Sequence, residues 1–156
     1  MCSIICYLFA NMHHGSLIDT FVQCFTLCMI AGDVRYQERG INALTQMNAW
    51  SIHSEWNFKN KLLLLKAEFH YTTRDVTTAA QCYDESIEAA QNHNFIHEEA
   101  MANELAGIFF FELGNCEQAM NHFKQAMACY RTWGAPVVAR RIEATIGMEL
   151  HTESKV

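Results

Sequence analysis

Two histidines four positions apart, His93 and His97, form the pair in this sequence that comes nearest to a metal site. On one helix this spacing puts two imidazoles on the same face, but a zinc site needs three or four ligands. Asn94 is a preferred helix cap, so the two histidines need not share a helix. His97-Glu98 also lacks the second histidine of the metalloprotease motif. We expect packing or solvent-facing roles, with metal binding as the alternative, and no cofactor.

Seven cysteines are scattered along the chain, an odd number that does not fit a disulfide framework. This usage is typical of a reducing compartment and predicts a cytoplasmic protein. Cys2 and Cys6, like Cys24 and Cys28, have CxxxC spacing, whereas redox sites usually have CxxC spacing. Because free cysteine packs as a small apolar residue, these pairs are predicted to lie in the core. Metal or redox chemistry is the alternative.

The sequence contains no glycine-rich phosphate loop and no GxSxG nucleophile element. Its 17 acidic residues outnumber its 11 lysines and arginines, for a net charge of −6, which argues against a nucleic-acid binder. We therefore predict a chain that is not itself an enzyme. A small helical hydrolase or redox protein that uses Cys and His is the competing hypothesis, and it requires a pocket where a Cys or carboxylate meets a His.

A long acidic interval separates Arg74 from Lys124. It contains nine Asp or Glu residues and no Lys or Arg. The interval is either a solvated acidic face or an electrostatic surface for a basic peptide or domain.

The elements that position these residues are predicted to be helices. A chain of 156 residues that is 51% apolar can form one well-packed domain, and its single proline argues against a turn-rich β fold. Helix caps at Asn57, Asp75, Asn94 and Asn115, and Pro136 in a first turn, mark several starts. Short connections predict antiparallel neighbours. About seven helices are expected, at roughly 16–30, 33–50, 58–71, 75–91, 94–113, 115–133 and 136–150.

The sequence contains an internal repeat of two units. Its period is the separation in sequence between Ala67 in the first unit and Gly107 in the second. Ala67, Ala79, Tyr83 and Ser86 form the first unit of the pattern, and Gly107, Ala119, Phe123 and Ala126 form the second with identical spacing. Gly107 and Ala119 are predicted to meet where two helices cross. Gly114 suits the turn of the second unit, whereas Arg74 does not suit that of the first.

This spacing resembles the tetratricopeptide repeat. It predicts an all-α fold of antiparallel hairpins stacked as a tetratricopeptide-like α-solenoid, with chance agreement in an ordinary helical bundle as the alternative. Residues 1–56 are expected to be N-terminal helices that continue an upstream repeat region. Residues 57–134 would form two hairpins, and residues 135–156 a capping helix and tail.

A second resemblance covers roughly residues 41–140. The stretches 94–100, 102–106 and 129–135, together with Asn57-Phe58, Lys61 and Ala67-Glu68, are similar to a helical-repeat segment of very large signalling proteins. In those proteins the segment follows protein-kinase-like and AAA-type ATPase domains and often precedes GAF and histidine-kinase domains. The resemblance implies that this chain is a fragment whose nucleotide sites lie in flanking domains. The cysteine-rich first thirty residues depart from that pattern.

The predicted function is a non-catalytic scaffold for protein–protein or interdomain contact, with a protein or flanking domains as partner. A membrane-associated protein anchored by residues 1–30 is a further alternative, although the apolar run 1–10 is too short to span a bilayer and lacks a basic leader. Stacked hairpins create a concave surface lined by the first helix of each unit. The predicted surface residues, for which inter-repeat packing is the alternative role, are Lys61, Leu64, Glu68, Tyr71, Met101, Glu104, Ile108, Phe111 and Glu112.

Overall fold

The computed structural model describes residues 34–153, and all the regular structure there is helical. This confirms the all-α class. The helix expected at 16–30 and the cysteine pairs at 2–6 and 24–28 lie outside the described residues. The six described helices are α3 (Val34–His53), α4 (Glu55–Thr72), α5 (Val76–Asn92), α6 (Ile96–Glu112), α7 (Cys116–Trp133) and α8 (Pro136–Glu153).

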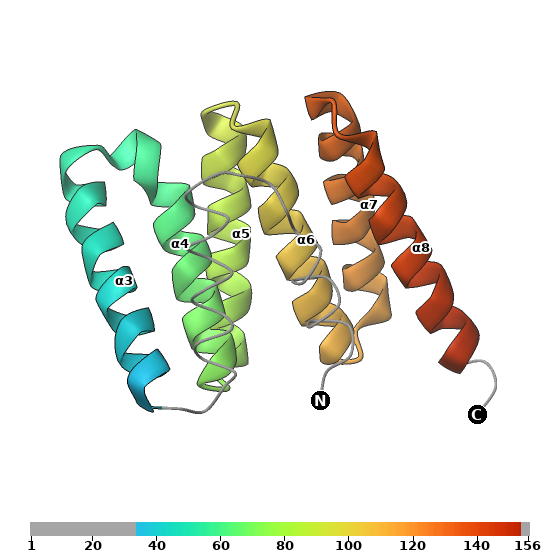
Figure 1. The fold of residues 1–156 in the computed structure, drawn as a ribbon, viewed down its shortest axis with the longest axis horizontal. Helices are drawn as coiled ribbons and strands as arrows, with labels where there is room; N and C mark the ends of the chain where they lie inside the picture. Colours follow the sequence, from blue (N-terminus) through green and yellow to red (C-terminus); the bar gives the residue numbers. More distant parts are fainter. Residues whose placement is uncertain (1–33, 154–156) are drawn as a thin grey trace. The chain divides into compact units, whose positions relative to one another are not determined.

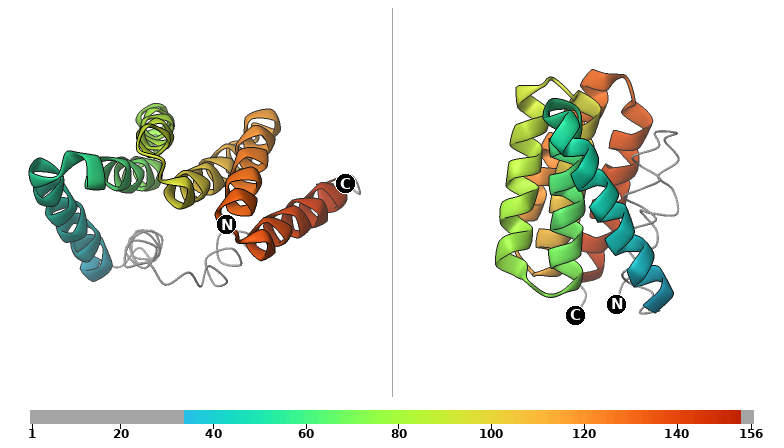
Figure 2. Two further views of the ribbon diagram at one scale, coloured as in Figure 1. Left: turned by 90° about the horizontal axis from the view of Figure 1, so that it is seen from above. Right: turned by 90° about the vertical axis from the view of Figure 1, so that its left-hand side faces the viewer.

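The described residues fall into two compact units, divided between His93 and Asn94. One unit contains α3, α4 and α5, and the other contains α6, α7 and α8. Within each unit the three helices run antiparallel to their neighbours in the chain, as short connections require (Figure 1). The views in Figure 2 show the same order inside each unit.

Two predicted helix starts are wrong. Helix α4 begins at Glu55 with Ser54 in the cap position, ahead of the predicted start at Phe58, and the Asn57 amide donates to the Ser54 hydroxyl at 3.1 Å. Helix α6 begins at Ile96 with Phe95 as its cap, because Asn94 adopts a left-handed conformation (φ 56°). Asparagine tolerates this conformation better than most residues, so here it ends a connection and does not cap a helix.

Residues in the left-handed conformation recur along the described chain at equal intervals, each half the period of the sequence repeat. They are Arg74 (φ 66°), Asn94 (φ 56°), Gly114 (φ 77°) and Gly134 (φ 96°). The period seen in the sequence therefore reappears in the backbone. Arg74 takes the turn conformation that only Gly114 was expected to supply.

The turns after α4 and α6 use the same hydrogen bonds. The backbone N–H of Asp75 donates to the His70 carbonyl, and that of Asn115 donates to the Phe110 carbonyl, both at 2.9 Å. This six-residue closure is the Schellman arrangement, which satisfies carbonyls at a helix end. The side chains of Asp75 and Asn115 then accept from the third following backbone N–H, each at 3.2 Å, and cap the next helix as predicted.

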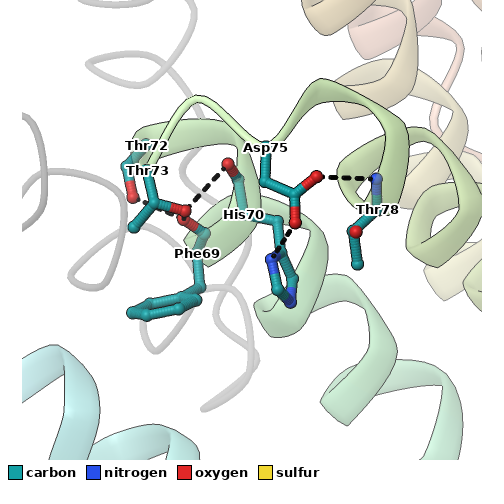
Figure 3. Close-up of polar contacts among 6 residues, drawn as sticks. All are labelled: Phe69, His70, Thr72, Thr73, Asp75 and Thr78. Atoms are coloured by element: carbon teal, nitrogen blue, oxygen red, sulfur yellow. Dashed lines mark hydrogen bonds and ion pairs between the residues drawn. The ribbon is translucent and has the colours of Figure 1, made fainter.

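The α4–α5 turn carries an additional contact between a carboxylate and an imidazole. Asp75 Oδ2 lies 3.2 Å from His70 Nδ1 while its other oxygen caps Thr78 (Figure 3). The hydrogen bonds from Thr78, and secondarily His70, lower the pKa of Asp75. Because the pKa of Asp75 is lower in the folded chain than in the unfolded chain, its contacts stabilise the fold at pH values above the ordinary pKa of the carboxyl group. This stabilisation is lost as the pH falls through the lowered pKa.

The turn pair gives a reciprocal test of backbone strain. Gly114→Ala is expected to destabilise its unit by about 1–2 kcal/mol, because an L-residue is disfavoured at positive φ. Nothing lies within 4 Å of the added Cβ, so the expected loss comes from backbone strain and not from a clash. Arg74→Gly is expected to be neutral or to stabilise by up to about 1 kcal/mol, since relief of strain competes with the extra freedom of glycine in the unfolded chain. Urea titrations followed by circular dichroism measure both. Equal destabilisation by the two changes would contradict the assignment.

The core of the α6–α8 unit forms where α6 crosses α7 most closely. A Cβ built on Gly107 would lie only 2.7 Å from two ring carbons of Phe123. The predicted close crossing is therefore present, although the atoms nearest to the added Cβ belong to Phe123 and not to Ala119, which is also fully buried. The equivalent positions of the other hairpin, Ala67 and Tyr83, are also fully buried.

Polar contacts accompany this crossing along the same face of α6. The Asn103 amide donates to the Glu99 carbonyl at 3.0 Å, so its oxygen is the acceptor that faces His122 Nδ1 at 3.1 Å. His122 therefore carries a proton on Nδ1, and its ring stacks on Phe110. Beside Asn103, Glu104 accepts from the Tyr130 hydroxyl at 2.9 Å. These contacts fix the register of α6 against α7.

Candidate protein-binding surfaces

Exposed aromatic residues gather at the open end of the α4–α5 hairpin, where α3 ends, α4 begins and α5 ends. Trp50, Ile52 and Trp56 are 44%, 75% and 55% exposed. The Trp56 ring lies 6.1 Å from that of His93, the residue that caps the end of α5, at an interplanar angle of 73°. We call Trp50, Ile52, Trp56 and His93 the first aromatic patch.

The open end of the α6–α7 hairpin carries a comparable group. Trp133, the last residue of α7, stacks on His97 near the start of α6, with ring centroids 4.3 Å apart and planes 28° apart. Trp133 is 46% exposed, and Val137 at the start of α8 is 67% exposed. We call His97, Trp133 and Val137 the second aromatic patch. His93 and Trp133 lie one period apart, so the two patches use equivalent positions of the repeat.

Such patches are suited to holding a protein partner. Tryptophan is enriched among the residues that dominate binding energy at protein interfaces. A ring already held against an imidazole loses less conformational freedom when a partner covers it, which reduces the cost of association. An indole that is half exposed at a helix end therefore combines a large apolar surface with a fixed orientation.

The charges beside the first aromatic patch are of both signs. Glu55 accepts from Lys59 at 2.8 Å, and this contact lowers the pKa of Glu55 and raises that of Lys59. Glu85 and Glu88 on α5 also act on Lys59, and His93 acts on Glu55. The rim of this patch is thus polar, as is usual around an apolar interface centre.

A half-buried thiol lies near the second aromatic patch. Burial raises the pKa of Cys129 to about 11, and the neighbouring Glu99 carboxylate contributes to the increase. Because the thiolate is the reactive form, we expect Cys129 to be inert at pH 8, where only about a thousandth of it is ionised. Its alkylation rate should rise about tenfold per pH unit up to its pKa.

Alkylation by iodoacetamide, followed residue by residue by mass spectrometry, measures this difference. The exposed Cys116 at the start of α7 is the internal reference, and it should react at least about ten times faster than Cys129 at pH 8. In urea the two rates should converge. Equal rates in the folded protein would show that Cys129 is not shielded.

The structure buries most of the surface residues expected from the sequence. Tyr71 and Phe111 are partly exposed and Glu112 is exposed. Glu68 accepts from the Tyr83 hydroxyl at 2.5 Å, and Lys61 donates to the Asn57 carbonyl at 2.7 Å. Six of the nine are buried within this chain: Lys61, Leu64, Glu68, Met101, Glu104 and Ile108.

The acidic interval is not one continuous surface either. Glu104 is fully buried and accepts from Arg141 Nη2 at 2.7 Å, and Asp75 is used as a helix cap. Asp84, Glu85 and Glu88 lie on α5, and all three are exposed. The interval thus divides into structural carboxylates and a smaller exposed set.

His93 and His97 serve different helices, since one caps α5 and the other lies in α6. Among the described residues, no three His, Cys, Asp or Glu side chains gather closely enough to hold a metal ion. Between residues 34 and 153, no helix is long and apolar enough to cross a bilayer.

Reasoning from the sequence missed the exposed tryptophans as site residues. They occupy helix ends, where helical periodicity over a long segment says little about which side chains are covered. A signal was nevertheless present, because Trp50 and Trp56 flank the corner at Ser54, and Trp133 adjoins the helix stop at Gly134.

Comparison of the chain with protein-family models, with curated proteins and with solved structures gives no match.

Proposed function

We propose that this chain is a non-catalytic, tetratricopeptide-like helical-repeat module that binds protein through its exposed aromatic patches. The observation that carries the proposal is the pairing of a half-exposed tryptophan with an imidazole at the open end of each hairpin. Tryptophan side chains that are exposed in this way are enriched at protein interaction sites.

The partner that fits best is a flanking domain of a longer cytoplasmic polypeptide. The resemblance of residues 41–140 to the repeat segment of kinase- and ATPase-containing signalling proteins supports this context. In that setting the module needs neither cofactor nor nucleotide of its own, and its task is to hold neighbouring domains in a defined arrangement.

Binding to the flanking domains tests the proposal. The domains encoded upstream and downstream in the reading frame are expressed separately and titrated against the chain by calorimetry. Trp56→Ala and Trp133→Ala are each expected to weaken binding by about 30-fold if the tryptophan is a dominant contact.

Val76→Ala and Leu113→Ala are matched controls, because both residues are exposed apolar side chains near the turns, at the opposite ends of the same hairpins. They are expected to change the affinity by less than about threefold. Absence of binding to every flanking domain, or equal losses in variants and controls, would refute the proposed function.

A further inference from the structure

Helix α8 repeats the position of α4 and α6 in the chain. These helices begin at Glu55, Ile96 and Pro136 and end at Thr72, Glu112 and Glu153, so corresponding bounds recur close to once per period. A left-handed residue precedes both α6 and α8, at Asn94 and Gly134, again one period apart. By this register α8 is the first helix of a further hairpin.

The register places Gly147 at the position of Gly107 and Ala67. On α6 this position receives Phe123 of α7, whose ring carbons come within 2.7 Å of a Cβ built on Gly107. On α8 a Cβ built on Gly147 meets nothing within 4 Å. The space beside Gly107 is therefore occupied by a side chain of the partner helix, whereas the space beside Gly147 is open.

The residues around Gly147 follow the same contrast. On α6 the face toward α7 includes Asn103 and Glu104, which are buried and bonded to His122 and Tyr130. Their counterparts on α8, Glu143 and Ala144, are exposed.

The opposite side of α8 is covered. Val138, Ala139 and Ile142 are buried, and Arg141 reaches the buried Glu104. In Figure 1 α8 accordingly runs beside α7. Helix α8 is thus packed on one side. The side that α4 and α6 use for their hairpin partners is exposed, and its polar contact is the exposed ion pair of Glu143 with Arg131 of α7.

We propose that the face of α8 formed by Glu143, Ala144 and Gly147 seats the second helix of a third hairpin, supplied by the polypeptide that follows residue 156. The continuity of the repeat defines the occupant, because α5 and α7 both carry a small residue, an aromatic four positions later and a small residue three further on. The occupant is an antiparallel amphipathic helix whose aromatic side chain covers Gly147. This inference rests on the proposed function in one respect, namely that the chain is a segment of a longer repeat protein.

The proposal can be tested by extending the chain with a second copy of α7, a helix that already carries the pattern expected of the occupant. Residues 1–152 are followed by a second copy of residues 113–134, which continues the register of the repeat after α8. The extended chain is expected to gain the helical ellipticity of one further helix and to melt about 5 °C or more above the natural chain. Gly147→Leu should abolish both gains in the extended chain, and Phe123→Ala in the appended copy alone should reduce them.

Two measurements on the natural chain complete the test. Gly147→Leu in residues 1–156 should leave the melting temperature unchanged or raised, since its side chain enters open space. An appended helix that remains unfolded, or an extension indifferent to Gly147→Leu, would overturn the proposal. So would a dimer of the natural chain, seen by light scattering, that Gly147→Leu dissociates, because the occupant would then be a second copy. None of these readouts depends on Trp56 or Trp133, so the seat and the proposed partner binding can fail independently.

Discussion

Gly107→Leu is expected to lower the free energy of unfolding of the α6–α8 unit by about 1–3 kcal/mol or more. Even a single added Cβ would lie 2.7 Å from the ring of Phe123, which is itself buried, so the ring cannot move aside without opening the core. Glycine inside a helix otherwise costs about 1 kcal/mol relative to alanine, so tight packing must reverse the usual sign of the change. Urea unfolding followed by circular dichroism measures the effect.

Gly147→Leu is the matched control, the same change in the same unit at a site with open space around it. It should be neutral or stabilise by up to about 1 kcal/mol. The double variant Gly107→Ala/Phe123→Leu should cost less than the sum of its single changes, because the smaller side chain makes room for the Cβ. An unchanged or raised stability of Gly107→Leu would refute the close crossing.

Arg141→Met should also destabilise the α6–α8 unit strongly, by about 3–5 kcal/mol. Glu104 has a fully buried side chain, and Arg141 donates to it from α8 at 2.7 Å. Removing the guanidinium leaves a buried carboxylate without that charge, and the cost of desolvation then falls on the folded state. Thermal and urea unfolding of the variant report this loss.

The contact between Arg131 and Glu143 provides the control for Arg141. It joins α7 to α8 across 3.5 Å, but both side chains are more than half exposed. Arg131→Met is therefore expected to change stability by less than about 1 kcal/mol. The double variant Glu104→Leu/Arg141→Met should be more stable than the sum of the two single changes predicts, because no buried charge remains. Additive losses would show that the pair is not coupled.

Much of the helical pattern could be read from local chemistry. Asp75 and Asn115 are strong caps and were correctly placed, and Gly134 with Pro136 marked both the end of α7 and the start of α8. Arg74 could not be recognised as a turn residue, because its positive φ is imposed by the hydrogen bonds that close the turn and not by its own preference.

The candidate site was less accessible to such reasoning. A register alignment identifies which residues share a helix face, but it does not say which face other helices cover. Glu104 was expected at a surface because the repeat alignment places it on the first helix of a hairpin, whereas its burial depends on Tyr130 and on Arg141, which come much later in the chain. Charged residues with a distant partner of this kind are visible only when the helices are packed together.

The turns recur at equal intervals, at Arg74, Asn94, Gly114 and Gly134. This spacing limits where residues can be inserted or deleted during evolution. Deleting one residue inside α6 would rotate everything beyond the deletion by about 100° about the helix axis. Gly107 would then turn away from Phe123, or Glu104 from Tyr130, whichever lay beyond the cut. We therefore expect natural insertions and deletions to fall at the turns or to comprise whole hairpins. Related chains should then differ in length mainly by whole repeats.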